Sequence, residues 1–319
     1  RTGVLRQSIP YPHLEHRPGD RRGSITIANV SGNATPSDIV VGWDYGSLSL
    51  FDHNLQPLWH RYLAAEAGRN HRTMGHTPFF ADIDGDGRDE ILAGSCLLDD
   101  DGALLWVAPD LPAIVKDTHA DSVQIAHLDD SGLPFIVMST GAYCFSLDGK
   151  LLWGRDELKH GQALRIGKLR ADLPGNQVVV YEGASRVDKS LPDKVVMLDK
   201  EGNLLWDREF VQPDMQEGGF GFWLGDWNGD GLDEVFVNDQ EKVNIIDGEG
   251  EIIETIPGFL IYVFDLVGDS RAEAVILTEI EPGMRMQIVT NDQPNPNPAT
   301  NAPISHRTTT PAMYNSTRY

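Results

Sequence analysis

Basic residues are scarce in this chain: 26 lysines and arginines stand against 48 aspartates and glutamates, a formal net charge of −22. This balance argues against nucleic acid as a partner, because phosphates demand basic surface. Apolar runs are short, and none approaches the roughly 18 residues of a membrane-spanning helix, so we expect no membrane segment. There are two cysteines, Cys96 and Cys144, which could form one bridge or remain two core thiols.

A sustained helical period is also absent, and a short strand motif recurs instead. Four times an apolar strand leads through a turn to a Leu-Trp pair, and the tryptophans are 47, 47 and 53 residues apart (Trp59, Trp106, Trp153 and Trp206). A fifth copy, residues 245–254, keeps a Glu-Gly turn but lacks the tryptophan. A period of this length with several strands is typical of β-propellers. We expect the tryptophans to pack between blades.

Each repeat has the pattern of four short strands separated by turns. Six repeats are visible, with first strands near Ile25, Phe79, Val123, Leu164, Phe222 and Ile261. Four antiparallel strands per repeat form one propeller blade. We predict an all-β chain with a single β-propeller domain over residues 1–319, closed by its N- and C-terminal segments. Seven blades are favoured, with six or eight as alternatives.

The turns between the first and second strands are rich in acidic residues. Two of them place oxygen ligands at positions 1, 3, 5, 7 and 9, with a backbone carbonyl at position 7. These ligands are Asp82, Asp84, Asp86, Arg88 and Glu90 in the second repeat, and Asp226, Asn228, Asp230, Leu232 and Glu234 in the fifth. Alternating oxygen ligands with glycine at the sharp turn are typical of calcium loops. We predict a structural calcium ion in each.

Two further acidic turns break this spacing. In the sixth repeat Val267 stands at position 3, between Asp265 and Asp269. In the third repeat the turn has only Asp129 and Asp130. We predict that both turns are solvated and hold no ion.

Three histidines recur at one phase of the repeat. His76, His119 and His160 each come just before a first strand, at spacings of 43 and 41 residues. In a propeller these connections open on the face opposite the acidic turns. Imidazoles gathered there suit metal ligation or proton transfer near neutral pH.

Other polar and aromatic residues should lie on the same face. The candidate catalytic residues are His71, His76, His119, His160, Tyr143 and Arg186. The candidate substrate-binding residues are Trp43, Tyr45, Arg72, Lys159 and Lys189. Aromatic platforms with nearby cations suit a carbohydrate that carries a carboxylate. In the alternative interpretation, Trp43 and Tyr45 pack within a blade.

The most specific segment is His76 with the run Phe80–Ile91, followed by His119-Ala-Asp121-Ser. Together with Leu173–Gln177 and the late Asp265–Arg271 turn, it resembles the rhamnogalacturonan lyases, calcium-dependent polysaccharide lyases built as large β-propellers. The resemblance covers residues 24–290. It implies an active-site calcium ion held partly by His76 and His119, with Asp121 as a further ligand.

The resemblance implies β-elimination next to a uronic acid. In this reaction a cation (calcium, Arg72 or Arg186) neutralises the carboxylate, a base removes the C5 proton and an acid protonates the departing O4. His71, His160 or Lys159 could be the base. Tyr143 or Tyr45 could be the acid. Rhamnogalacturonan, a terminal rhamnose–glucuronate linkage and ulvan are the candidate substrates.

Two functions of other classes compete with this one. The first is a non-catalytic, integrin-like propeller that binds glycan or protein. The second is a propeller with a quinone cofactor, to which the Gly-x-Leu-Leu-Trp repeat is similar. For the lyase we expect an anionic plant or algal polysaccharide as partner, a monomer, and a secreted or extracytoplasmic location, with the cytoplasm as the alternative.

Overall fold

The computed structural model describes residues 3–10, 23–43, 46–66, 78–109, 120–139, 141–211, 222–280 and 283–297. Within these ranges the chain forms six antiparallel sheets and two helices of four residues, α1 (Leu63–Glu66) and α3 (Ala184–Val187). Short apolar runs between Gly- and Asp-rich turns favour strands of this length. The predicted all-β fold class is confirmed.

The sheets follow one another in chain order. The first contains β1 (Gly23–Ala28), β2 (Asp38–Trp43), β3 (Ser47–Phe51) and β4 (Pro57–Tyr62). The second contains β5 (Phe79–Ala81), β6 (Glu90–Ala93), β7 (Cys96–Leu98) and β8 (Leu104–Val107). The third contains β9 (Val123–Ala126), β10 (Phe135–Met138), β11 (Tyr143–Phe145) and β12 (Leu151–Gly154).

The second half of the chain repeats this pattern. The fourth sheet contains β13 (Gly161–Gly167), β14 (Gln177–Glu182), β15 (Asp193–Leu198) and β16 (Leu204–Phe210). The fifth contains β17 (Phe222–Gly225), β18 (Glu234–Asp239), β19 (Lys242–Ile246) and β20 (Ile252–Pro257). The sixth has three strands, β21 (Phe259–Phe264), β22 (Glu273–Ile280) and β23 (Gly283–Val289).

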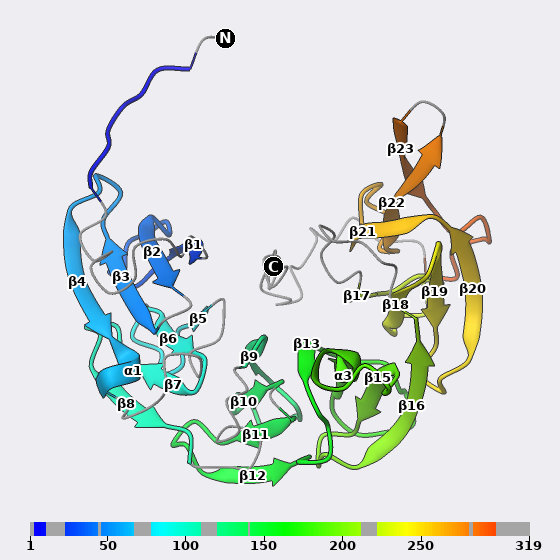
Figure 1. The fold of residues 1–319 in the computed structure, drawn as a ribbon, viewed down its shortest axis with the longest axis horizontal. Coiled ribbons are helices and arrows are strands. Elements are labelled where there is room, and N and C mark those ends of the chain that lie inside the picture. The colour runs from blue at the N-terminus through cyan, green and yellow to red at the C-terminus, as the bar shows by residue number, and fades with distance from the viewer. Residues whose placement is uncertain are drawn as a thin grey trace.

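The sheets stand in an arc around a common centre, with first strands such as β5, β9 and β13 innermost and β8, β12 and β16 outermost (Figure 1). Each is the blade of a propeller-like arrangement. The described residues form no sheet between β1–β4 and β21–β23. Closure by the two terminal segments and the blade number stay predictions, because residues 11–22 and 298–319 lie outside the described part.

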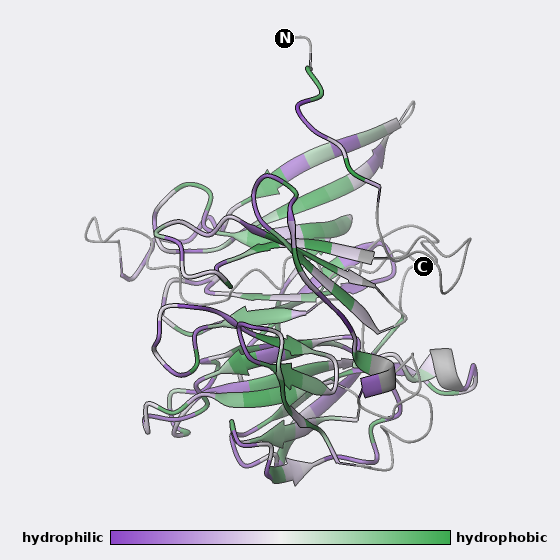
Figure 2. Cartoon of the chain, turned by 90° about the vertical axis from the view of Figure 1, so that its left-hand side faces the viewer, coloured by the Kyte–Doolittle hydropathy of each residue, from purple (hydrophilic) through white to green (hydrophobic). Residues whose placement is uncertain are grey.

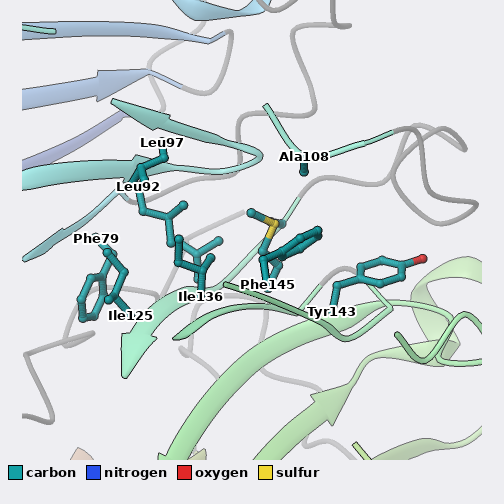
Figure 3. Packing of buried hydrophobic residues seen from close by; sticks show 11 residues of the cluster. Phe79, Leu92, Leu97, Ala108, Ile125, Ile136, Tyr143 and Phe145 are labelled. Atoms are coloured by element: carbon teal, nitrogen blue, oxygen red, sulfur yellow. The ribbon is translucent and has the colours of Figure 1, made fainter. Parts of the chain in front are cut away.

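The core lies between neighbouring sheets. Five clusters of buried apolar side chains join each sheet to the next along the arc. Between the second and third sheets, Leu92 and Leu97 pack toward Ile136 and Phe145 (Figure 3). Hydrophobic residues follow the strands, and hydrophilic residues gather in the turns (Figure 2). Cys96 and Cys144 are both buried free thiols in these clusters, so the alternative of a bridge is wrong.

The repeated tryptophans connect each blade to the next. A Cβ atom on the turn glycine of the following blade would lie within about 3 Å of each indole, in the pairs Trp59–Gly102, Trp106–Gly149, Trp153–Gly202 and Trp206–Gly250. All four glycines have φ between +79° and +88°, which also disfavours other residues. Each indole N–H donates to a turn carbonyl of that next blade, at 2.8–3.3 Å. The predicted packing between blades is confirmed.

The fifth copy lacks the tryptophan where the next sheet offers no such turn. Glu254 pairs with Ile245, in the register in which Trp206 pairs with Met197. The sixth sheet ends with its third strand, and the described residues after it run to the acidic turns instead. Arg271 donates to the carbonyls of Asn291 and Gln293 in that segment, at 3.1 and 2.8 Å. An indole at position 254 would therefore have no equivalent turn to contact among the described residues.

Candidate cation turns and candidate active site

The turns between the first and second strands share one framework. The residue that opens the second strand accepts, through its side-chain oxygen, the backbone N–H of the second turn residue. This distance is 2.7 Å for Glu90, 2.9 Å for Gln177, 2.7 Å for Glu234 and 2.6 Å for Glu273. We call these four the closing residues. They align the turns of the second, fourth, fifth and sixth sheets position by position.

The first position is aspartate in three of the four turns. The carboxylate accepts the backbone N–H groups of positions 4 and 6, at 2.7 and 3.0 Å for Asp82, 2.7 and 2.9 Å for Asp226, and 2.6 and 3.0 Å for Asp265. These bonds fold the loop around its own acidic side chains. Carboxylates that would otherwise repel one another are thereby held close together.

The turn of the second sheet gathers three exposed carboxylates. One oxygen each of Asp82, Asp84 and Asp86 lies within 4.8 Å of the others. The neighbouring guanidinium of Arg88 pairs with Asp100, outside the turn, at 2.6 Å. In the fifth sheet the amide oxygen of Asn228 takes the place of Asp84. Clustered oxygen ligands of this kind fit a hard cation such as calcium.

The closing glutamates of these two turns are buried beside other acids. Burial, together with the charges of Asp84, Asp99 and Asp82, raises the pKa of Glu90 to about 7. Burial, with Asp230, Asp226 and Asp233, raises the pKa of Glu234 to about 8. A bound cation would favour the ionised form of both side chains. The closing glutamates of these two turns thus bind a proton more readily than an ordinary glutamate does.

The turn of the sixth sheet supplies its own cation. The guanidinium of Arg271 pairs with Asp269 through Nη2 at 2.7 Å and Nε at 3.1 Å. These bonds hold the pKa of the Asp269 carboxyl below its ordinary value. Val267, at position 3, is 61% exposed and offers no ligand. The sixth turn thus has a counter-charge of its own at position 5, and the expectation that it holds no ion stays a prediction.

The fourth sheet reverses the charge of the first position, which sequence reasoning missed. Lys168 stands where the other turns have aspartate, and its Nζ donates to the carbonyls of Leu173 and Gly175, at 2.5 and 2.8 Å. The closing residue is the neutral Gln177. A signal existed in the sequence, because Lys168 follows its strand as Asp82 does. The turn is nine residues long between Gly167 and Gln177, one more than in the second sheet, which hid the match.

On the opposite face the structure brings two predicted residues together. Nε2 of His160 lies 3.1 Å from Oδ2 of Asp121, and the two side chains are 12% and 1% exposed. Asp121 precedes β9 of the third sheet, and His160 precedes β13 of the fourth. The pair therefore spans a junction between blades, at the end of the strands away from the acidic turns.

Backbone contacts fix this junction. Ser122 and Ser139 are joined by two hydrogen bonds of 3.0 Å within the third sheet. A Cβ atom on Gly161 would lie only 1.6 Å from the carbonyl oxygen of Ser139. Glycine is needed there because the start of β13 presses directly on the neighbouring blade. This close approach places His160 beside Asp121.

Glu182 anchors the connection that carries His160. Its Oε1 accepts the backbone N–H of Lys159 at 2.5 Å, and burial raises its pKa. The side chain of Lys159 is exposed next to this anchor, and Lys189 is exposed after α3. Both lysines are thus available to a ligand.

Tyr143 lies in the packed core between the second and third sheets. It is 1% exposed, its ring centroid lies 6.4 Å from that of Phe145, and its hydroxyl donates to Asp156. Figure 3 shows the ring at the end of the cluster with the hydroxyl directed away from it. This placement favours a structural role over contact with substrate.

Several predicted residues cannot be placed in the same way. His71, Arg72, His76, His119 and Tyr45 lie outside the described residues. The backbone positions of Trp43, at the end of β2, and Arg186, in α3, are described, but their side chains are not. Their roles stay predictions. In the described part of the chain, no helix has the length and apolar character needed to span a membrane.

Comparison with known proteins finds a relative by sequence. No protein-family model matches the chain. The rhamnogalacturonan exolyase YesX of Bacillus subtilis is 26% identical over 247 residues, in a match that covers 68% of this chain and 37% of that protein. The chain thus spans well under half the length of this relative.

Solved structures show the same fold. The exotype rhamnogalacturonan lyase YesX matches 84% of this chain and 46% of its own, with a TM-score of 0.60 and 20% identity. A Bacillus licheniformis rhamnogalacturonan lyase matches 84% and 45%, with a TM-score of 0.55 and 20% identity. The Vibrio cholerae biofilm matrix protein Bap1 matches 81% and 66%, with a TM-score of 0.52 and 14% identity. The chain is thus similar to rhamnogalacturonan lyases and has a propeller-like fold, as the resemblance implied.

Proposed function

We propose that this chain carries the propeller of a polysaccharide lyase that cleaves rhamnogalacturonan by β-elimination, with help from calcium. The observation that carries the proposal is the His160–Asp121 pair at the junction of the third and fourth sheets. It lies on the face where the repeat phase also predicts His76 and His119. The similarity to YesX supports the choice of substrate class.

His160 is the candidate base. Its imidazole is partly exposed, while Asp121 beside it is buried. A buried carboxylate next to an imidazole can fix the orientation of the ring and stabilise the imidazolium that forms. The C5 proton of the uronate passes to this base, its electrons form the C4–C5 double bond, and the C4–O4 bond breaks. His71 and Lys159 are the alternatives.

The leaving oxygen needs a proton, and the uronate carboxylate needs a positive neighbour. Tyr143 is buried with its hydroxyl on Asp156, which leaves Tyr45 as the better candidate acid. His76, His119 and Asp121 would hold the active-site calcium ion. When bound, this ion would neutralise the carboxylate and so acidify the C5 proton. Arg72 and Arg186 are alternative sources of that charge.

The test is the ultraviolet absorbance of the unsaturated product formed from rhamnogalacturonan. His160→Ala should lower kcat/KM by roughly two orders of magnitude or more, the usual contribution of a general base. His127→Ala is the matched control, because His127 is exposed in a turn on the opposite face. A chelator should abolish product formation. No product from pectic, gum or ulvan substrates would refute the proposal.

A non-catalytic, glycan-binding propeller is the second candidate. It is favoured by the fold likeness to Bap1, which is a biofilm matrix protein and shares the arrangement at a TM-score of 0.52. Such a protein would bind the polysaccharide without forming an unsaturated product. Replacing His160 would then leave the affinity unchanged.

A further inference from the structure

Two of the second strands end in a carboxylate that holds a connection between blades. Glu182 is the last residue of β14, and its Oε1 accepts the backbone N–H of Lys159 at 2.5 Å. Asp239 is the last residue of β18, and its Oδ1 accepts the backbone N–H of Val211 at 3.2 Å. Lys159 lies in the connection from the third sheet to the fourth, and Val211 in the connection from the fourth to the fifth. The two carboxylates thus make the same contact in neighbouring blades.

A backbone hydrogen bond accompanies each of these contacts. The N–H of Gly183 donates to the carbonyl of His160 at 2.7 Å, and the N–H of Gln240 donates to the carbonyl of Val211 at 2.8 Å. We call the side-chain contact and the backbone contact together a carboxylate clamp. The second strands of the other four sheets end in uncharged residues, Trp43, Ala93, Met138 and Ile280. The sheets therefore form without a carboxylate at this position, and the clamp is an addition to the repeat.

The clamp of the fourth sheet holds the backbone on both sides of the candidate base. The N–H of Lys159 is bonded to the side chain of Glu182, and the carbonyl of His160 is bonded to the N–H of Gly183. The next residue, Gly161, pairs with Glu182 in the ladder between β13 and β14. Fixed points this close together leave the backbone of His160 little freedom. They therefore set the direction in which the imidazole leaves the chain.

This direction matters because the partner of His160 belongs to another blade. Nε2 of His160 lies 3.1 Å from Oδ2 of Asp121, which precedes β9 of the third sheet. A displacement of about 1 Å in a reacting group can cost on the order of 100-fold in rate. A connection that shifted relative to the fourth sheet would move the imidazole relative to Asp121. Glu182 is the side chain that holds this connection to the fourth sheet.

We infer that Glu182 is a positioning residue, which acts through the backbone of Lys159 and His160 to hold the candidate base against Asp121. The inference rests on the proposed function, because that function makes His160 the base. It adds to that function the residue that places the imidazole. The N–H of Lys159 needs an acceptor at the right reach and does not need a charge, since a backbone N–H is a neutral donor.

Substitutions of Glu182 separate reach from charge. Glu182→Gln keeps an acceptor oxygen at the same reach, so kcat on rhamnogalacturonan should stay within about twofold of the parent. Glu182→Met removes the acceptor and Glu182→Asp retracts it by one methylene, so both should lower kcat about tenfold and leave KM unchanged. Asp239→Leu is the matched control. It removes the carboxylate clamp of the fifth sheet, where the carbonyl of Val211 takes the place of that of His160, and should leave kcat unchanged.

The NMR signals of the His160 ring nitrogens test the inference without catalysis, because they report the contact with Asp121. They should move in Glu182→Met and Glu182→Asp, and match the parent in Glu182→Gln and Asp239→Leu. If this pattern appears in a protein that forms no unsaturated product, the lyase proposal fails and the inference stands.

Two results would overturn the inference. The first is an unchanged His160 ring in Glu182→Met, whatever the activity; Glu182→Asp decides the point if the methionine variant does not fold. The second is an equal loss of kcat in Glu182→Gln and Glu182→Met, because the charge of Glu182 and not its reach would then be responsible.

Discussion

The acidic turns of the second and fifth sheets and the turns of the fourth and sixth share one backbone framework but differ in charge. In the first two, carboxylates gather around Asp82 and Asp226, and the guanidinium of Arg88 pairs with Asp100 outside its turn. In the other two, the chain supplies the cation itself. Lys168 donates to two carbonyls of its turn, and Arg271 pairs with Asp269.

This difference indicates that the shared backbone framework of the turns does not by itself require a bound metal ion. Arg88 and Arg271 occupy the same position of their turns, yet Arg88 pairs with Asp100 outside its turn and Arg271 with Asp269 inside. Whether the arginine at this position pairs inside or outside its turn thus decides whether the turn retains its negative charge. Two turns are expected to depend on calcium, and two to be independent of it.

Of the changes considered, removal of calcium should lower the stability of the fold most. At calcium concentrations about 100-fold above Kd, each bound ion stabilises the fold by about 2.7 kcal/mol, so two turns together contribute about 5 kcal/mol. Chemical denaturation with and without chelator measures the combined stabilisation by the two ions. Hydrogen exchange locates it, because the amides of Gly85, Gly87, Gly229 and Gly231 should lose protection. An equal loss in the turns of the fourth and sixth sheets would break the comparison.

Lys168→Met should be the most damaging single substitution in these turns. It leaves two carbonyls of the turn without their charged donor, a loss of roughly 2–3 kcal/mol. The loss should be the same in calcium and in chelator, as measured by urea denaturation. Lys150→Met, at an exposed lysine, is the control and should change stability by less than about 0.5 kcal/mol.

Much of the fold could be predicted from the sequence, because the repeat is long and regular. The Trp spacing placed the strands, and the phase placed His160 on the face opposite the acidic turns. The role of Lys168 could not be predicted in this way. Its turn is one residue longer than the others, and the match to Asp82 depends on the pairing of Gly167 with Gln177.

The candidate site was predicted less well than the fold. The repeat phase placed His160 on this face and the family resemblance added Asp121, but neither could say that the two side chains meet. Tyr143 shows the limit of this reasoning. Side chains of a strand alternate between two faces, so an error of one residue exchanges the inside for the outside. The sequence placed Tyr143 in a loop facing substrate, and the structure buries it.

The effect of Glu234→Gln on the stability of the fold should change sign when calcium is added. Without a cation, the pKa of Glu234 lies at about 8 in the folded protein against an ordinary value of 4.5, so the folded state keeps a proton that the unfolded state loses. Stability therefore falls as pH rises from about 5 to 8. The glutamine avoids this loss, as Gln177 does in the fourth sheet.

At pH 8 in chelator we therefore expect the free energy of unfolding of Glu234→Gln to exceed that of the parent by roughly 2 kcal/mol. In calcium the order should reverse, because the variant has lost a charged ligand. Thermal unfolding at pH 5 and 8 measures both effects. Glu249→Gln, at an exposed glutamate, is the control. A variant less stable than the parent under all four conditions would contradict the assignment of Glu234 to a cation turn.

Arg271→Gln should have the smallest effect and sharpens the comparison most. It removes the guanidinium from Asp269 and from the carbonyls of Asn291 and Gln293, a loss of about 1 kcal/mol for a partly exposed group. Arg88→Gln, at the equivalent position, should lose less, because its partner lies outside the turn. Addition of Val267→Asp to Arg271→Gln restores the missing ligand. If charge decides the need for metal, only this double variant should gain stability from calcium in its sixth turn, seen as calcium-dependent protection of the Gly268 amide.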